Sequence, residues 1–388
     1  MILLRSIFSD TTPQERIAFG DEPASEQSMT VWDVLQRDER VSKFADIVGM
    51  FDDIVLGLST PQAKFTVYAP VNEAFDDMFF PPDLPWFYWK FLAGYHMGPG
   101  SLSEADLKSQ STISSFVNAD VFFTYKQRIS VQERSLGRVG LNHAAIVLPT
   151  EQRDQASATN GFVHHIDSVL ELPNSTARVI QQWPELSRFS EALSRTGLWL
   201  PTGDTNGHVG QTIFAPSNEA FSRLGAKSTS FLFSRGGIPY LTALLKFHIV
   251  QNHTLFSDVY FPHADQPLVN FAATGAATGS AGGGAAQAHL PTLHPGVDVT
   301  TTLRRQPHEK VSLCARLVGS PRGVETEEIA ASVPDIVLMD GVIHVVNSLF
   351  LPTAMQEGDR GWHWLKTPWS RGVSVEQLME ILDPWVAW

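Results

Sequence analysis

Four histidines recur at matched positions in the two halves of this sequence, and they are the side chains best suited to acid–base chemistry. They are His96, His164, His248 and His344. Histidine exchanges protons near neutral pH, but a buried imidazole needs an internal hydrogen-bond partner for each ring nitrogen. Because each of the four has an apolar residue beside it, the pattern favours a structural role over catalysis.

Metal and cofactor binding find little support in the sequence. His164 and His165 are adjacent, so on a strand they point to opposite faces, and no third ligand follows at a fixed spacing. Cys314 is the only cysteine, which excludes an internal disulfide and a multi-cysteine metal cluster. We therefore expect no metal and no cofactor.

An aromatic-rich segment offers an alternative site. Trp86, Trp89, Tyr95 and His96 lie close together in the sequence and are the candidate binding residues. Together with His143, the pair Tyr95 and His96 could carry acid–base chemistry on an aromatic substrate. Packing in a domain core is the competing explanation for the aromatic cluster. No nucleophile elbow accompanies these residues, so no catalytic residue is assigned outside this alternative.

Charge and apolar patterning exclude other classes of function. The net charge of −13, from 28 Lys and Arg against 41 Asp and Glu, repels a phosphate backbone, so nucleic acid is not an expected partner. The chain lacks the run of about 18 apolar residues that predicts a transmembrane segment. The apolar start of the chain ends at Arg5 and is too short for a signal peptide.

Two N-glycosylation acceptor triplets point instead to the secretory pathway. They begin at Asn174 and Asn252. Such triplets are common by chance. Either a leader is missing from this sequence or the protein is intracellular, so the residues leave the localisation unknown.

The two halves of the chain are copies of one another. Residues 65–75 read FTVYAPVNEAF and residues 211–221 read QTIFAPSNEAF, with seven of eleven positions in agreement. A later block, GFVHHIDSVL from Gly161, corresponds to GVIHVVNSLF from Gly341. Matches in the same order along both halves indicate a tandem duplication.

The second copy contains an insertion. The spacing between matched residues grows from 152 to 180 towards the C-terminus, and residues 271–288 are almost entirely Gly, Ala, Ser and Thr. Such a composition buries too little apolar surface to offset its ordering entropy. We expect a flexible surface loop near residues 271–296.

Each copy is predicted to begin with helices and continue with strands. Thr30 is followed by apolar residues at helical spacing, and residues 65–68 and 211–214 resemble buried strands that end at Ala-Pro. Asn72 in the first copy, and either Ser217 or Asn218 in the second, are predicted to cap the helices that follow. This order of elements predicts an α+β fold.

These blocks resemble the signatures of the fasciclin I (FAS1) family. Its first signature resembles TVYAPVNEAF and TIFAPSNEAF, its central Tyr-His resembles Tyr95-His96, and its last resembles the blocks from Gly161 and Gly341. The resemblance implies two tandem FAS1-like domains, each a two-sheet β-wedge flanked by helices. The second copy departs from it at Phe247, so any activity of the Tyr-His pair would belong to the first copy.

The resemblance also sets the expected domain boundaries. The first FAS1 domain covers residues 30–173, after an N-terminal extension of residues 1–29, and the second covers residues 174–353. Residues 354–388 form a Trp-rich tail. A capping box begins at Ser374 within it and predicts a short helix that ends at Pro384 and docks against a domain.

Two functional hypotheses follow from the resemblance. FAS1 proteins are mostly secreted, surface-anchored or vacuolar, which implies a non-enzymatic adhesion protein with a protein or glycan partner. The alternative is an enzyme, or an auxiliary protein acting with oxidases on a small aromatic ligand in a biosynthetic pathway, because some fungal fasciclin-like proteins resemble this arrangement. Whether the chain is an enzyme stays uncertain, although the absence of a catalytic constellation argues against it.

Overall fold

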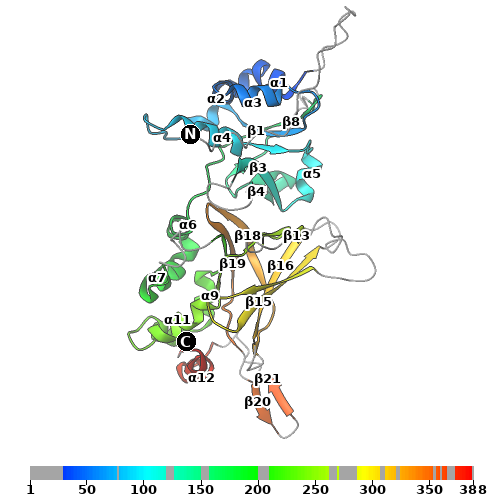
Figure 1. Cartoon of the computed structure of the whole chain (residues 1–388). Helices are drawn as coiled ribbons and strands as arrows, with labels where there is room; N and C mark the ends of the chain where they lie inside the picture. Colours follow the sequence, from blue (N-terminus) through cyan, green and yellow to red (C-terminus); the bar gives the residue numbers. More distant parts are fainter. Residues whose placement is uncertain are drawn as a thin grey trace, which may run out of the picture. The chain divides into compact units, whose positions relative to one another are not determined.

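The computed structural model describes residues 29–76, 78–118, 126–149, 157–199, 209–261, 269–270, 286–305, 311–319, 324–352, 355–358, 361–364 and 372–386. The chain divides into two compact units, one that ends at Leu172 and one that begins at Pro173 (Figure 1). Each unit combines helices with mainly antiparallel sheets. The predicted α+β class with two tandem domains is confirmed.

Three short helices form one layer of the first unit. They are α1 (Val31–Arg37), α2 (Ser42–Gly49) and α3 (Asp52–Leu58). Thr30 caps α1: its hydroxyl accepts a hydrogen bond from the Asp33 N–H, and the Asp33 carboxylate accepts one from the Thr30 N–H. The buried side chains of Leu35 and Phe44 belong to one apolar core with Val67 of the adjacent sheet.

Two four-stranded sheets complete the first unit. One has the order β2 (Met97–Pro99), β1 (Phe65–Pro70), β8 (Gly161–Ile166), β7 (Ser157–Ala158), and the other β3 (Thr112–Asn118), β4 (Lys126–Glu133), β5 (Val139–Leu141), β6 (Ala145–Ile146). The first sequence block and the last block of the repeat are therefore neighbours, because β1 and β8 pair in parallel. Helices α4 (Trp86–Tyr95) and α5 (Glu104–Ser109) follow β1 and β2 in the chain.

The second unit repeats this plan with more helices. They are α6 (Thr176–Gln182), α7 (Ser187–Thr196), α9 (Asn218–Arg223), α10 (Ala226–Leu232), α11 (Ile238–Lys246) and α12 (Val375–Val386). Ser217 caps α9 through a bond from the Ala220 N–H to its hydroxyl. Strand β9 (Gln211–Pro216) pairs in parallel with β19 (Gly341–Val346), as β1 does with β8.

One strand joins the sheets of the second unit. The path is β10 (Ile249–Gln251), β9, β19, β18 (Ile329–Leu338), β16 (Val311–Gly319), β15 (Val297–Arg305), β14 (Ala286–Pro291), with β17 (Val324–Glu325) beside β16. Strand β18 pairs with β16 at its start and with β19 further on, and its pairing with β19 contains two register shifts. Such bulges bend a strand and increase its twist, which lets one strand serve both sheets.

Five shorter strands form two small sheets in the second unit, and each unit also contains 3₁₀ turns. The small ladders are β11 (Thr254–Leu255), β12 (Val259–Phe261) and β13 (Val269–Asn270), and the hairpin of β20 (Met355–Gly358) and β21 (Gly361–Trp364). Asn72 lies in the 3₁₀ turn η2 (Asn72–Phe75), and Pro184 lies in the 3₁₀ turn η5 (Pro184–Leu186).

The expectation of a flexible loop near residues 271–296 is wrong for its second part. Residues 271–285 lie outside the described residues, but Ala286–Pro291 form strand β14, paired along its whole length with β15. Leu290 is completely buried, so apolar burial and ladder hydrogen bonds offset the ordering entropy there.

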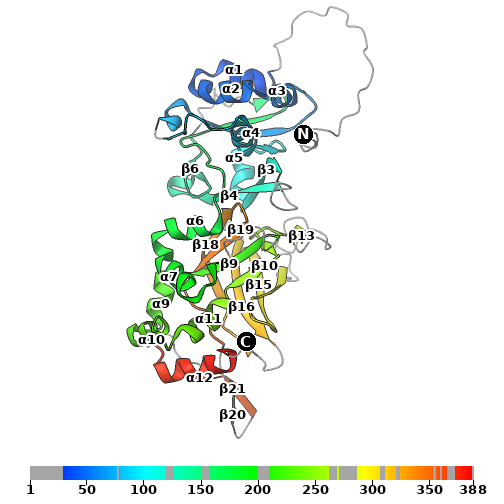
Figure 2. The same ribbon diagram turned by 60° about the vertical axis from the view of Figure 1, so that its left-hand side comes forward.

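The predicted C-terminal helix docks against the second unit, beside α10 and α11 (Figure 2). Ser374 and Gln377 form its capping box, and Leu378 and Leu382 are completely buried. The predicted end at Pro384 is wrong, since α12 continues to Val386. A proline removes only one backbone donor, and in the last turn the carbonyl that loses its partner can be hydrated.

Candidate functional site

One recurring histidine in each unit lies at the C-terminal end of a helix and is completely buried. The Nδ1 atom of His96 lies 2.8 Å from the Leu92 carbonyl, and its Nε2 accepts a hydrogen bond from the Leu170 N–H at 2.9 Å. His248 repeats this with the Leu244 carbonyl at 3.0 Å and the Phe350 N–H at 3.0 Å. Since Nε2 is an acceptor in both, Nδ1 carries the proton and the rings are neutral.

The other two recurring histidines lie on the paired central strands. His164 Nε2 is 2.7 Å from the Leu102 carbonyl, and His344 Nε2 is 2.7 Å from the Leu255 carbonyl. The Nδ1 of His344 accepts from the Asp335 N–H at 3.2 Å. The prediction that these histidines satisfy internal hydrogen bonds is confirmed.

Burial controls the protonation of these rings. It lowers the pKa of His96, His248 and His344 to about 4, although the carbonyl partner of each opposes the shift. Burial also lowers the pKa of His164. A ring that is neutral at physiological pH and bonded through both nitrogens to the backbone stabilises the fold and is poorly placed to transfer a proton to a ligand.

Tyr95 is equally engaged inside the first unit. Its hydroxyl donates to the Arg128 carbonyl at 2.9 Å and accepts from the Asn142 side chain at 2.7 Å, and burial raises its pKa. His143 follows Asn142 with a left-handed backbone (φ 60°), and its N–H donates to the Gln132 side chain. The structure thus brings Tyr95 near the loop that carries His143.

The two tryptophans have different surroundings from Tyr95 and His96. Trp86 lies in the first turn of α4 with 56% of its surface exposed, and its ring is 6.4 Å from that of Phe51. Trp89 is half-buried, with its ring 5.0 Å from Phe80. These residues do not line the cleft described below, so a ligand site at this cluster stays a prediction.

The two glycosylation triplets lie in ordered segments. The Asn174 carbonyl accepts a bond from the Met339 N–H, and the Asn252 side chain accepts one from the Val209 N–H at 2.9 Å. Both asparagines are half-buried. Glycosylation at either stays a prediction, which intact mass with and without glycosidase would check.

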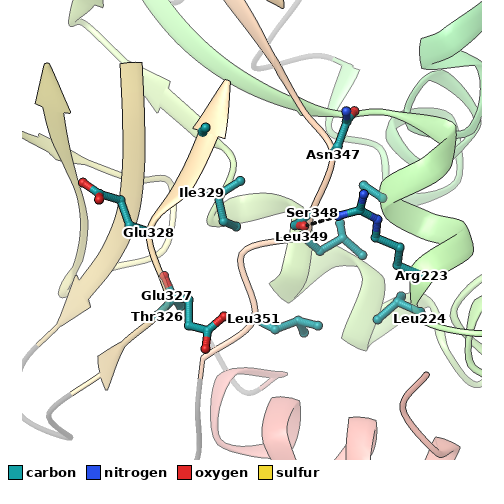
Figure 3. A pocket seen from close by; sticks show the side chains of 12 residues that line it. Arg223, Leu224, Thr326, Glu327, Glu328, Ile329, Asn347, Ser348, Leu349 and Leu351 are labelled. Atoms are coloured by element: carbon teal, nitrogen blue, oxygen red, sulfur yellow. Dashed lines mark hydrogen bonds between the residues drawn. The ribbon is translucent and has the colours of Figure 1, made fainter. Parts of the chain in front are cut away.

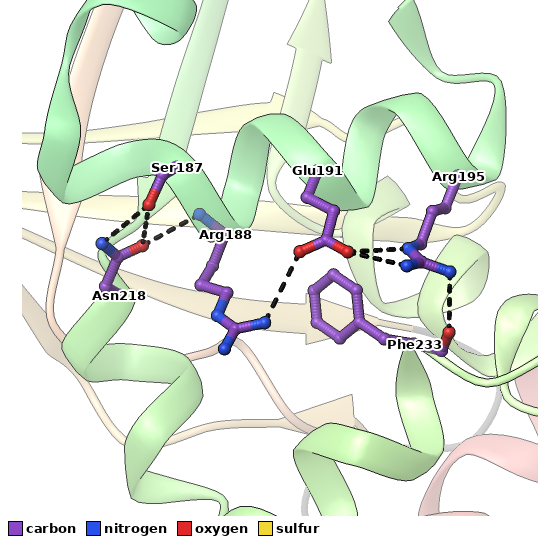
Figure 4. A network of polar contacts seen from close by, with 6 residues as sticks. All are labelled: Ser187, Arg188, Glu191, Arg195, Asn218 and Phe233. Atoms are coloured by element: carbon purple, nitrogen blue, oxygen red, sulfur yellow. Dashed lines mark hydrogen bonds and ion pairs between the residues drawn. The ribbon is translucent and has the colours of Figure 1, made fainter.

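Two asparagines that the sequence assigns to capping have another role. Asn218 Oδ1 accepts from the Arg188 N–H at 2.9 Å in the first turn of α7 (Figure 4). Its Nδ2 donates to the Pro184 carbonyl at 2.9 Å. Asn72 does the same with the Lys43 N–H at 3.0 Å and the Glu39 carbonyl at 2.8 Å. The capping prediction is therefore wrong for Asn72, whereas in the second copy Ser217, and not the alternative Asn218, is the cap.

Each of these asparagines acts as a clamp that ties the turn after the first strand to the start of a helix about 30 residues earlier in the chain. Helix N-termini leave backbone donors without intrahelical partners, and a side chain from elsewhere in the fold can satisfy them. The recurrence of asparagine at the same position of both repeats was the available signal. Its distant partner was not visible in the sequence.

A cleft of about 250 Å³ opens in the second unit. It lies between the last turn of α9, the segment that enters β18 and the segment that follows β19. Figure 3 shows Arg223 on one side, Glu327 on the facing segment, and Ile329 and Leu349 between them. Sequence analysis missed this cleft because its lining comes from three segments that are more than 100 residues apart at the extremes.

Neither a metal site nor a membrane span emerges from the described part of the chain. No group of three or more His, Cys, Asp or Glu side chains there could hold a metal ion. Among the helices that the structure describes, none is long and apolar enough to cross a bilayer.

Comparison with known proteins gives consistent results. The fasciclin domain model matches residues 39–173 and 184–268. Aurofusarin biosynthesis cluster protein S of Gibberella zeae is 50% identical over 369 residues, which cover 94% of this chain and 88% of that protein. Protein sll1483 of Synechocystis sp. is 27% identical over 164 residues, covering 40% of this chain and 81% of that protein.

The solved structures include a FAS1 domain pair from the insect cell adhesion molecule fasciclin I. It covers 80% of this chain and 97% of its own, with 17% identity and a TM-score of 0.37.

Proposed function

Since this chain belongs to the fasciclin family, we propose that it is a non-enzymatic interaction protein that assists the enzymes of a biosynthetic pathway. The observation that carries the proposal is the 50% identity, over 94% of the chain, with a protein named for a biosynthesis cluster. We carry over the role in a pathway and not the product in that name. A location at the cell surface, in the matrix or in a vacuole, as in the family, is part of the same proposal.

The buried histidines support an auxiliary role over a catalytic one. His96 would be the natural acid–base group, yet both of its ring nitrogens bond to the backbone and its pKa is about 4. The Tyr95 hydroxyl is likewise bonded on both sides. Recruiting either group for catalysis would require breaking bonds that hold the domain core together.

Exposed apolar side chains on the first unit support an interaction role. Five large ones lie within residues 50–87: Met50, Leu56, Phe79, Trp86 and Phe87. Phe79 is 85% exposed and Phe87 is 49% exposed. Aromatic residues are enriched at protein–protein interfaces, so we assign this region to contact with a pathway partner.

The test is deletion of the gene in its own host, followed by mass spectrometry of the metabolites and an assay of surface attachment. We expect a pathway precursor to accumulate, the product to fall, and the intact gene to restore both. Unchanged metabolites with reduced attachment would overturn the proposal in favour of adhesion. Conversion of the accumulated precursor by the purified chain alone would overturn its non-enzymatic part.

Complementation with surface variants tests the contact region. The double variant Trp86→Ser, Phe87→Ser should fold normally and restore the product poorly, because about half of each side chain is exposed. Leu136→Ser is the matched control, since Leu136 is a large apolar residue of the same unit that is 93% exposed. Equal restoration by both variants would contradict the assignment of the contact region.

A further inference from the structure

The floor of the cleft in the second unit is apolar. Leu224, Leu349 and Leu351 line it and are 2%, 7% and 2% exposed, so their side chains present a packed aliphatic surface. Ile329 lies over the same space and is half-buried. An apolar floor of this kind favours a ligand whose body is a hydrocarbon ring system.

The two walls of the cleft carry opposite hydrogen-bonding chemistry. Arg223 is held by Glu219, at 2.7 Å from Nη2 to Oε1, and by the Ser348 hydroxyl at 3.2 Å from Nη1. A guanidinium has five N–H groups, so these two contacts leave donors for an oxygen of the ligand. Glu327, on the facing wall, offers carboxylate acceptors (Figure 3).

The charge around the cleft disfavours an anionic ligand. Arg223 supplies one positive charge, whereas Glu219, Glu327 and Glu328 supply three negative ones. The whole chain also carries a net charge of −13. The negative local potential would therefore repel the net charge of a carboxylate or phosphate at Arg223. A neutral carbonyl compound has no net charge to be repelled.

We propose that this cleft binds a neutral aromatic compound of one or two rings that carries a carbonyl group and a hydroxyl group. Its rings lie on the leucine floor, its carbonyl accepts from Arg223, and its hydroxyl donates to Glu327. A volume of about 250 Å³ is just below the usual range for drug-sized ligands, which limits the compound to one or two rings. The inference deepens the proposed function and rests on it for the source of the ligand, a pathway intermediate.

The repeat confines this site to the second domain. Arg223 corresponds to Asp77 in the first copy, and Asn347, which also lines the cleft, corresponds to Asp167. A carboxylate at the position of Arg223 removes the donor that the ligand carbonyl requires. The site is thus a property that the second copy has acquired and not a general feature of the duplicated fold.

Calorimetric titration of the purified full chain with two matched probes tests the inference. The first probe is a neutral acetylnaphthol, and the second is the hydroxynaphthoate in which a carboxylate replaces the acetyl group. We expect saturable binding of the neutral probe with a stoichiometry of one, and about tenfold weaker binding of the anion. No saturable binding of the acetylnaphthol, or equal affinity for the two probes, would overturn the proposal.

Three variants place the binding in the cleft. Arg223→Gln should weaken binding of the acetylnaphthol about tenfold by loss of a charged hydrogen bond. Ala330→Trp should abolish it, because Ala330 is an exposed residue of the lining from which a large ring can fill the space without entering the core. Arg188→Gln is the control, since Arg188 is an equally exposed arginine of the same unit, paired with Glu191 outside the cleft.

The results separate this inference from the proposed function. Unchanged binding in both Arg223→Gln and Ala330→Trp, with normal thermal unfolding, would overturn the assignment to this cleft. Should Arg223→Gln not fold, Ala330→Trp decides alone. A metabolite defect in the gene deletion combined with no binding would retain the pathway role and reject the ligand site.

Discussion

The two domains place different buried polar side chains, an amide in one and a carboxylate in the other, at the same position before the last strand of the repeat. In the first, Asn160 accepts from the Val31 N–H at 2.7 Å and donates to the Leu58 and Thr60 carbonyls at 2.8 and 3.0 Å. In the second, Asp340 occupies the corresponding position. Its carboxylate accepts at 3.0 Å from the Thr176 N–H and at 3.0 Å from the Gln211 side chain.

This difference shows that the fold requires a polar side chain at this position but does not require one residue type. Both residues are completely buried next to the last strand block, so the position must carry a polar group whose bonds are all made. The residue type then follows from the neighbours: carbonyls demand the amide of Asn160, and donors demand the carboxylate of Asp340. The two copies have kept the site and exchanged its chemistry.

The surfaces of the two domains differ more than their cores. In the second domain α12 packs on α11, where the Trp385 ring lies 5.6 Å from Phe247 and the Tyr240 hydroxyl bonds to Asp383 at 2.7 Å. In the first domain the equivalent helix, α4, leaves Trp86 and Phe87 exposed. Divergence after duplication has therefore acted on what covers the common fold, which is where we place function.

The largest effect is expected where the two domains are most alike. Gly341 lies so close to β9 that a Cβ atom would overlap the Gln211 carbonyl oxygen, and Gly161 lies equally close to Phe65. Gly341→Ala should destabilise the second domain by more than about 4 kcal/mol while the first stays folded. Urea titration followed by peptide-resolved hydrogen exchange measures this. Gly236→Ala, at an open position, is the control and should change stability little.

A reciprocal exchange of the buried polar residues sharpens the comparison. Asn160→Asp places a carboxylate against two carbonyls and should cost about 3 kcal/mol in the first domain. Asp340→Asn should cost less in the second domain, because the Gln211 amide can rotate to present its oxygen to the new NH₂ group. The same hydrogen-exchange measurement compares them. A larger loss for Asp340→Asn would refute this account of the two sites.

A smaller difference is expected in how much stability each domain loses in acid. An unfolded histidine has a pKa near 6.5, whereas burial keeps His248 and His344 of the second domain, and His96 of the first, at about 4. The unfolded state thus binds more protons between these values, so stability is lost as pH falls from 6.5 towards 4. Each ring contributes about 2 kcal/mol of loss at pH 5.

Between pH 7 and pH 5 the second domain should therefore lose more stability than the first. The difference is at most about 2 kcal/mol, since burial also lowers the pKa of His164 and so destabilises the first domain in acid. Urea midpoints of each domain at the two pH values give the comparison. Identical pH dependence in both domains would show that the deeper burial of His344, relative to His164, does not control acid stability.

The smallest effects concern the asparagine clamps. Asn218→Ala and Asn72→Ala each remove two exposed hydrogen bonds to the backbone and should destabilise their own domain by about 1 kcal/mol. Glu219→Gln, which weakens only a surface ion pair, is the control and should cost less. If Asn72→Ala has no effect while Asn218→Ala does, the clamp is important in only one copy.

Local features of the fold were predictable from the sequence. The helix that begins after Thr30, the strands that end at proline and the capping box at Ser374 depend on residues within one turn or one strand of each other, and the duplication is read by comparing the two halves of the chain. The internal hydrogen bonding of the repeated histidines was predictable for a related reason. A polar group that recurs among apolar neighbours must be satisfied wherever the fold buries it.

Features that depend on distant partners were decided by the tertiary structure. The partner of Asn218 is a helix turn 30 residues away, and strand β14 is stabilised by its pairing with β15. Arg223 and Glu327 line the same cleft although they are more than 100 residues apart in the chain. The sequence by itself determined two α+β domains of one family, because propensity and capping are local and the repetition is visible when the two halves are compared residue by residue. Only the tertiary structure decided which polar groups are satisfied and where a cleft remains, because both depend on packing between segments whose separation in the chain carries no such information.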